Sequence, residues 1–302
     1  MRKFIVLLTL LLMSTFILTA CNPTKSSDID ENAGETISDE ETSTDVISIE
    51  KTSPETINKS YQIYEEIINT INAGISLDFN LDFEMIDNNN PSQVKKMFEN
   101  RVHIFKSNTN IDIFRDITNV HTDGNQYNNK MYFKDGHYYE EAIVFNYDIE
   151  LSRNRAKREW DLQTYLEKSE TKFLEFKKEA VKEATIAEHE NGKVISFVLD
   201  EEKMTQLLTI FPKDMKASYI EGNDIKFDDV NVEIGVDKDN TLTYFNILSS
   251  IEIQTENENQ VMTYTSKTKI NKIGDDVKID FPEDLDEYPE MSPAIKELID
   301  NY

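Results

Sequence analysis

The most regular pattern in the chain is a strict alternation of apolar and polar side chains over residues 75–85. A period of two predicts a strand with one buried and one solvated face. Just before it, residues 57–71 place apolar side chains at every third or fourth position and end near Gly74, which predicts an amphipathic helix. The apolar positions of the alternating stretch are Ile75, Leu77, Phe79, Leu81, Phe83 and Met85.

Many later stretches have the length and spacing of antiparallel strands. An Asp-Gly pair between two aromatic-rich runs at residues 131–140 predicts a hairpin. The other predicted strands cover residues 102–105, 111–120, 127–133, 138–144, 185–190, 194–199, 225–236, 242–254, 261–273 and 277–279.

Two stretches change to a helical period. Residues 155–184 predict one long helix, or two helices with a bend, and residues 200–212 predict a shorter helix that Pro212 ends. The element order predicts an α+β fold, in which a single curved antiparallel sheet forms a half-barrel and helices cover its concave face. No linker rich in Pro, Gly or Ser divides this part, so we expect one domain over residues 56–290 and a C-terminal tail over residues 291–302.

The N-terminus has the pattern of a secretory signal: two basic residues, a short apolar run, and small residues before Cys21. The tetrad Leu18-Thr19-Ala20-Cys21 resembles the lipobox of bacterial lipoproteins, in which the cysteine becomes the lipid attachment point and the chain is cut before it. This resemblance implies a signal peptide over residues 1–20 and a protein anchored by lipid to the outer face of the cell membrane. A retained transmembrane segment is the alternative.

Charge and composition narrow the range of partners. Residues 21–55 are rich in Ser, Thr, Asp and Glu, which predicts a disordered acidic tether behind the lipidated cysteine. The formal net charge of −26 repels nucleic acid and anionic lipid head groups, so it disfavours a nucleic-acid partner. Because Cys21 is the only cysteine, no disulfide can form within the chain.

No pattern of catalytic or metal-binding residues stands out. The four histidines have no ligand spacing, and no second cysteine is available for a zinc site. Residues 237–240 resemble the start of a calcium loop, but the required glycine and the closing glutamate are missing, so a hairpin turn is the better interpretation. With 58 acidic residues in the chain, chance carboxylate pairs are expected. We therefore predict a protein without cofactor or metal, and not an enzyme.

Three stretches carry a family resemblance: MYFKDGHYYE at residues 131–140, EHENGKVISFVLDEEKMTQLL at residues 188–208, and KIDFPEDLDEY at residues 278–288. Together with the lipobox and the long strands, they resemble LolA-like half-barrel lipoproteins, which include the mycobacterial lipid-carrier lipoproteins and uncharacterised Firmicutes families. The resemblance spans about residues 57–288 as topology, and it carries no site residue over. It implies a hydrophobic cavity between the concave sheet face and the helices.

Aromatic side chains at alternate strand positions either fill such a cavity as core or line it for a ligand. Two functions remain open: binding or carrying a lipid or other apolar molecule, and, as the alternative, docking a basic protein or peptide partner through the acidic surface. The predicted lining residues are Phe79, Leu81, Phe83, Phe114, Tyr132, Phe197, Phe245, Ile247 and Ile251, with Trp160, Phe173 and Leu207 on the covering helices.

Overall fold

The computed structural model describes residues 46–90, 94–107, 110–120, 125–146, 149–160, 174–200, 224–254, 259–293 and 296. All of them belong to one compact unit, Thr44–Tyr302. The strands are β1 (Val46–Glu50), β2 (Leu77–Asp87), β3 (Val94–Ser107), β4 (Asn110–Val120), β5 (Asn125–Lys134), β6 (His137–Asn146), β7 (Ile149–Glu159), β8 (Val181–His189), β9 (Gly192–Leu199), β10 (Asp224–Asp237), β11 (Leu242–Gln254) and β12 (Asn259–Ile273). The helices are α2 (Pro54–Asn72) and the short 3-10 helices η1 (Lys178–Ala180), η5 (Gly274–Asp276) and η6 (Leu285–Glu287).

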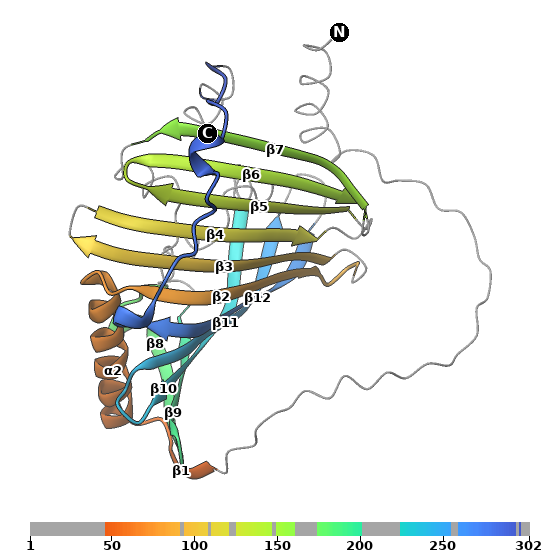
Figure 1. Cartoon of the computed structure of the whole chain (residues 1–302). Helices are drawn as coiled ribbons and strands as arrows, with labels where there is room; N and C mark the ends of the chain where they lie inside the picture. The colour runs from red at the N-terminus through yellow and green to blue at the C-terminus, as the bar shows by residue number, and fades with distance from the viewer. Residues whose placement is uncertain are drawn as a thin grey trace, which may run out of the picture. The chain divides into compact units, whose positions relative to one another are not determined.

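The twelve described strands form one antiparallel sheet in the order β1-β8-β9-β10-β11-β12-β2-β3-β4-β5-β6-β7 (Figure 1). Two meanders make up most of it. The first runs from β2 to β7, and the second runs from β8 back to β12, which pairs with β2 and joins the two meanders. Strands β1 and β7 lie at the two edges.

The predicted α+β half-barrel with helices over a concave face is wrong. The described residues are mainly strand, the sheet is open at β1 and β7, and α2 is the only α-helix that can be followed from end to end within them. The predicted helix over residues 155–184 accounts for much of the error. Its first residues belong to β7 and its last residues to β8, while residues 161–173 and the predicted helix over residues 200–212 lie outside the described residues, Asp200 excepted.

Cross-strand pairing explains why the helical pattern failed in residues 155–184. Ala180 and Ala184 are four residues apart, as on a helix face, but Ala184 pairs with Phe197 of β9. At the other end, β7 pairs along β6 from Asn146 to His137. Sheet pairing and burial in this context outweigh the local helical spacing.

Helix α2 was predicted correctly, and its start is specified locally. The Ser53 hydroxyl oxygen accepts a hydrogen bond from the backbone N–H of Thr56 at 3.0 Å, and Pro54 occupies the first turn. The helix buries Ile63, Tyr64, Ile67 and Ile68, whose spacing of three and four residues forms one apolar stripe.

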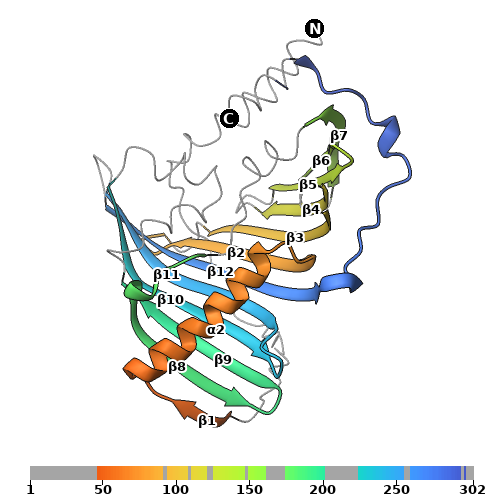
Figure 2. The same cartoon turned by 90° about the vertical axis from the view of Figure 1, so that its left-hand side faces the viewer.

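Helix α2 packs on one face of β8–β12 and β2 (Figure 2), and the main apolar core lies between them. Strand β10 illustrates the pattern, because Val230, Val232 and Ile234 are all buried and alternate with exposed residues. This alternation confirms the predicted half-buried strands and directs every second side chain away from α2.

The C-terminal segment crosses β2–β7 on the side seen in front in Figure 1. Leu285 and Tyr288 pack there against Tyr132 of β5 and Tyr139 of β6. Met291, the first residue of the predicted tail, is buried with Ile113 in a further cluster.

Strand β1 lies within the residues that we expected to belong to the tether. It pairs with β8, from Val46 opposite His189 to Glu50 opposite Ile186.

Candidate functional site

The face of the sheet opposite α2, which we call the polar face, carries the candidate site. Phe83 of β2 and Phe245 of β11 belong to the core under α2. Because successive strand side chains point to opposite faces, their neighbours Asp82 and Tyr244 lie on the polar face. The polar side chains of the alternating pattern at residues 75–85 therefore belong to the polar face.

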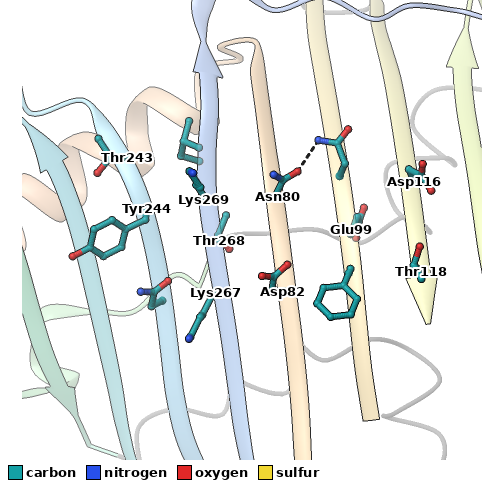
Figure 3. Close-up of a pocket in the computed structure, with 14 residues that line it drawn as sticks. Asn80, Asp82, Glu99, Asp116, Thr118, Thr243, Tyr244, Lys267, Thr268 and Lys269 are labelled. Atoms are coloured by element: carbon teal, nitrogen blue, oxygen red, sulfur yellow. Dashed lines mark hydrogen bonds between the residues drawn. The ribbon is translucent and has the colours of Figure 1, made fainter. Parts of the chain in front are cut away.

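A groove of about 730 Å³ lies on this face and crosses β11, β12, β2, β3 and β4. Figure 3 shows its side chains rising from these neighbouring strands. We call it the polar groove, and the side chains that the polar face contributes are Asn80, Asp82, Phe98, Asn100, Asp116, Thr118, Tyr244, Asn246, Lys267 and Lys269.

The strand register arranges these side chains in two parallel rows that run across the strands. The first row is Tyr244, Lys269, Asn80, Asn100 and Asp116, and each member pairs directly with the next. The second row, two residues away along each strand, is Asn246, Lys267, Asp82, Phe98 and Thr118. Directly paired residues lie about 5 Å apart, so each row forms a continuous line of side chains.

Hydrogen bonds between neighbouring strands fix the amide groups of the first row. The Asn100 side-chain amide donates to the Asn80 oxygen Oδ1 at 2.9 Å and to Asp78 at 3.2 Å. At the β4 end, the Asn128 amide donates to Asp116 at 2.7 Å and to Thr118 at 3.1 Å. These hydrogen bonds hold the side chains of the first row in place without a ligand.

Tyr244 is held flat at the other end of the groove. A Cβ atom added at Gly235, its partner on β10, would come within 2.1 Å of the ring carbon Cε1, so the ring lies over the glycine backbone. Burial raises the pKa of the Tyr244 hydroxyl, and the charge of Glu233, to which it is hydrogen-bonded, raises it further. The hydroxyl therefore stays protonated and donates to Glu233, and this hydrogen bond fixes the position of the ring.

Other side chains of the groove project towards solvent. Phe98 is 42% exposed although it is a large aromatic residue. Asp82, Lys267 and Lys269 are also exposed, and no hydrogen bond or ion pair links them to another residue within the described part of the chain. The groove thus combines the hydrogen-bonded amides of Asn80 and Asn100 with exposed charged groups and two aromatic rings.

A second hollow of about 410 Å³ continues the polar groove toward β8 and shares Asn246 and Lys267 with it. Polar side chains such as Ser196 of β9 and Asn231 of β10 line it, with the exposed Leu248 of β11 among them. The hollowed part of the polar face therefore extends from β8 to β4.

The residues that we predicted to line an apolar cavity are divided among separate places. Those buried in the core under α2 are Phe83, Phe197, Phe245, Ile247 and Ile251. Phe114 and Tyr132 pack on the polar face beneath the C-terminal segment, with ring centroids 5.2 Å apart. Trp160 packs against Tyr138 in a third cluster.

Two further members of that set, Phe79 and Leu81, lie on the α2 side of β2, and Phe79 is almost completely buried. Phe173, Leu207 and the lipobox residues 18–21 lie outside the described residues.

A buried cluster of charges lies on the α2 side of β3 and β4, and the sequence pattern did not predict it. Glu99 accepts hydrogen bonds from Arg101 at 2.6 Å and Arg115 at 2.7 Å. Burial alone would raise the pKa of Glu99, but the two guanidinium charges and their hydrogen bonds lower it to about 2. Burial, with these same arginine charges, lowers the pKa of the adjacent His103 to about 3.

The Glu99 side chain is only 2% exposed, as is that of Arg101, so this cluster holds β3 and β4 together rather than offering a ligand site. The period-two spacing of Glu99, Arg101 and His103 was the available signal, but we predicted the strand only from residue 102.

Neither a cluster of metal ligands nor a long apolar helix occurs in the described part of the chain. Within it, no group of three or more His, Cys, Asp or Glu residues is arranged to hold a metal ion. Among the same residues, no helix combines the length and the apolar character needed to cross a membrane.

Comparisons with known proteins identify no family. No family model matches the chain, and no curated protein matches it. Among solved structures, the dehydratase domain from the CurK module of curacin polyketide synthase aligns over 70% of this chain and 81% of its own, with 8% identity and a TM-score of 0.11. An inactive mutant of that dehydratase gives 7% identity over the same shares of both chains, and its TM-score is also 0.11. Similarity at this level carries no argument about fold or function.

Proposed function

We propose that this protein is a non-enzymatic binding lipoprotein, anchored by lipid at the outer face of the cell membrane, that holds a polar ligand in the polar groove. One observation carries the proposal. A preformed groove of about 730 Å³ contains the hydrogen-bonded amides of Asn80 and Asn100. Phe98, Lys267 and Lys269 project into it from neighbouring strands. Exposed aromatic and charged groups on a rigid scaffold are typical of binding surfaces.

The location rests on the N-terminal sequence. The tetrad ending at Cys21 supports lipid attachment, and a diacylglyceryl group supplies two acyl chains, which hold a protein on a membrane more stably than one chain does. The acidic segment at residues 22–45 would then act as a tether between the lipid anchor and the folded unit.

The packing favours a polar ligand over the lipid that the family resemblance implied. Five of the predicted lining residues fill the core under α2, and two more are covered by the C-terminal segment. A lipid ligand needs apolar surface that is free to receive it.

The groove also favours a ligand with little net charge over the basic partner that the acidic composition suggested. Lys267 lies beside Asp82, Lys269 lies beside Asn80, and Asp116 ends the first row, so the groove contains two lysines and two aspartates on its polar face. The strong negative charge of the whole chain is therefore not concentrated in the groove.

The test uses the full mature chain, residues 21–302, with Cys21→Ser, and introduces one cysteine at a time. Cell-envelope material is divided into a water-soluble polar fraction and an organic lipid extract. The rate of maleimide labelling at Asp82→Cys is then measured without additions and with each fraction. Glu159→Cys, an exposed acidic position at the end of β7, is the matched control.

The proposal predicts that the polar fraction slows labelling at position 82 severalfold and leaves position 159 unchanged. If the lipid extract binds the protein and the polar fraction does not protect position 82, the lipid-carrier function is the correct one. If neither fraction protects position 82, the groove is not the binding site.

A further inference from the structure

We infer that the ligand of the polar groove is a glycan chain, an uncharged or weakly charged polymer rich in hydroxyl groups. This inference rests on the proposed binding function and specifies the chemical class of the ligand. It comes from three properties of the groove: its aromatic surfaces, its balance of donors and acceptors, and its direction across the sheet.

The aromatic surfaces suit the apolar faces of sugar rings. A pyranose ring presents a face of C–H groups, which packs well against an aromatic ring, while its hydroxyl groups lie around the rim. The Tyr244 ring is fixed in place by Gly235 beneath it and by the hydrogen bond to Glu233. Phe98 is exposed on β3, in the second row. A ring held in one orientation loses little conformational freedom when a ligand packs on it.

The polar side chains between the two rings suit hydroxyl groups, which both donate and accept hydrogen bonds. Asn246 offers both donors and acceptors, Asp82 offers acceptors, and Lys267 offers donors. Cationic and anionic groups are balanced, so an anionic polymer and a strongly cationic one each meet a like charge. Nucleic acid is further disfavoured by the net charge of −26.

The direction of the groove favours a chain of several sugars. Tyr244 and Phe98 lie on strands that are three spacings apart, which corresponds to roughly 14 Å across the sheet. A single sugar cannot reach both rings, whereas a short oligosaccharide can.

A peptide ligand fits this geometry less well. Extended peptides commonly bind by adding a strand to the edge of a sheet, where free backbone groups are available. The polar groove lies on the face of the sheet, and the five strands that form it are paired on both sides. Its side chains therefore supply all of the recognition.

The experiment titrates the full mature chain carrying Cys21→Ser with oligomers of N-acetylglucosamine and of glucose, from one to six units, by isothermal calorimetry. The inference predicts saturable binding to at least one series, with affinity rising as the oligomer grows long enough to reach both rings. Phe98→Ala and Tyr244→Ala should each weaken binding roughly tenfold.

Leu151→Ala is the matched control, because Leu151 is an exposed apolar residue of the edge strand β7, 61% accessible and outside the groove. It should leave the affinity unchanged. Because Phe98 is itself exposed, its replacement should have little effect on folding. Thermal unfolding curves of both ring variants show whether they remain folded.

The possible results distinguish a failure of the glycan inference from a failure of the proposed binding function. If no oligomer binds although the polar envelope fraction protects Asp82→Cys from labelling, the glycan inference is wrong and the binding function stands. If no oligomer binds and nothing protects that position, both are wrong. If oligomers bind equally well to the wild type and to both ring variants, the glycan site is elsewhere and this inference fails.

Discussion

At the scale of single residues, the sheet keeps ionisable groups in unusual states by surrounding them with specific charges. Glu99 remains a carboxylate inside the protein because Arg101 and Arg115 both donate to it. Burial, together with the same two positive charges, keeps His103 neutral. Breaking such a buried cluster by removing one partner is costly, because a charge is left behind without compensation.

This environment predicts a pH dependence of stability. The pKa of His103 falls from an ordinary value of 6.5 to about 3 in the folded protein. Below the ordinary value the unfolded chain binds the proton and the folded chain does not, so acidification favours unfolding. When the pH falls from about 7 to about 5, the wild type should lose about 1 to 2 kcal/mol more unfolding free energy than His103→Gln. Urea denaturation at both pH values measures this difference.

Glu99 does not interfere with that measurement, because its pKa is lowered and its contribution is lost only as the pH falls from about 4.5 toward 2. His189→Gln provides the control, since His189 lies at the end of β8, six strands away from β3 in the sheet. Equal pH dependence in the wild type and in His103→Gln would contradict the account.

At the scale of elements, the sequence predicted those parts whose signals are local. Helix α2 has its own cap and apolar stripe, and β2 has its own alternation, so both were predicted close to their observed bounds. Strand β7 could not be predicted in this way. It is rich in arginine and lysine, and it becomes a strand because β6 lies beside it and Glu141 on that strand binds Arg153 and Arg155.

The attachment of α2 to the rest of the core also depends on a distant contact. The Tyr64 hydroxyl donates to the Leu174 carbonyl at 3.0 Å and accepts from the Phe176 N–H at 2.9 Å, and its ring stacks on Phe176. Tyr64→Phe leaves both buried backbone groups without this partner, so we expect a loss of about 1 to 3 kcal/mol in unfolding free energy.

Tyr61→Phe is the comparison for this prediction. The Tyr61 hydroxyl donates to the Phe176 carbonyl over a longer distance, 3.2 Å, and it is only partly buried. Water can replace that bond, so the loss measured by chemical denaturation should be smaller than for Tyr64→Phe. A larger loss for Tyr61→Phe would mean that the buried contact at Tyr64 does not hold the helix in place.

At the scale of the whole folded unit, the pairing of β12 with β2 creates both the sheet and the candidate site. This pairing joins residues about 180 positions apart in the chain, such as Lys267 and Asp82. The sequence predicted polar faces on both strands but gave no information on which strands would be neighbours. The two rows of the polar groove therefore could not be foreseen, although most of their members occupy predicted polar positions.

The central claim is that the polar face, rather than an apolar cavity, meets the ligand. The most direct test replaces Phe98 in the full chain by a photo-crosslinking amino acid and irradiates living cells, with Leu151 replaced in the same way as the control. The account predicts a crosslinked polar envelope component at position 98 and none at position 151. Crosslinks to membrane lipid at position 98, or identical products at both positions, would contradict it.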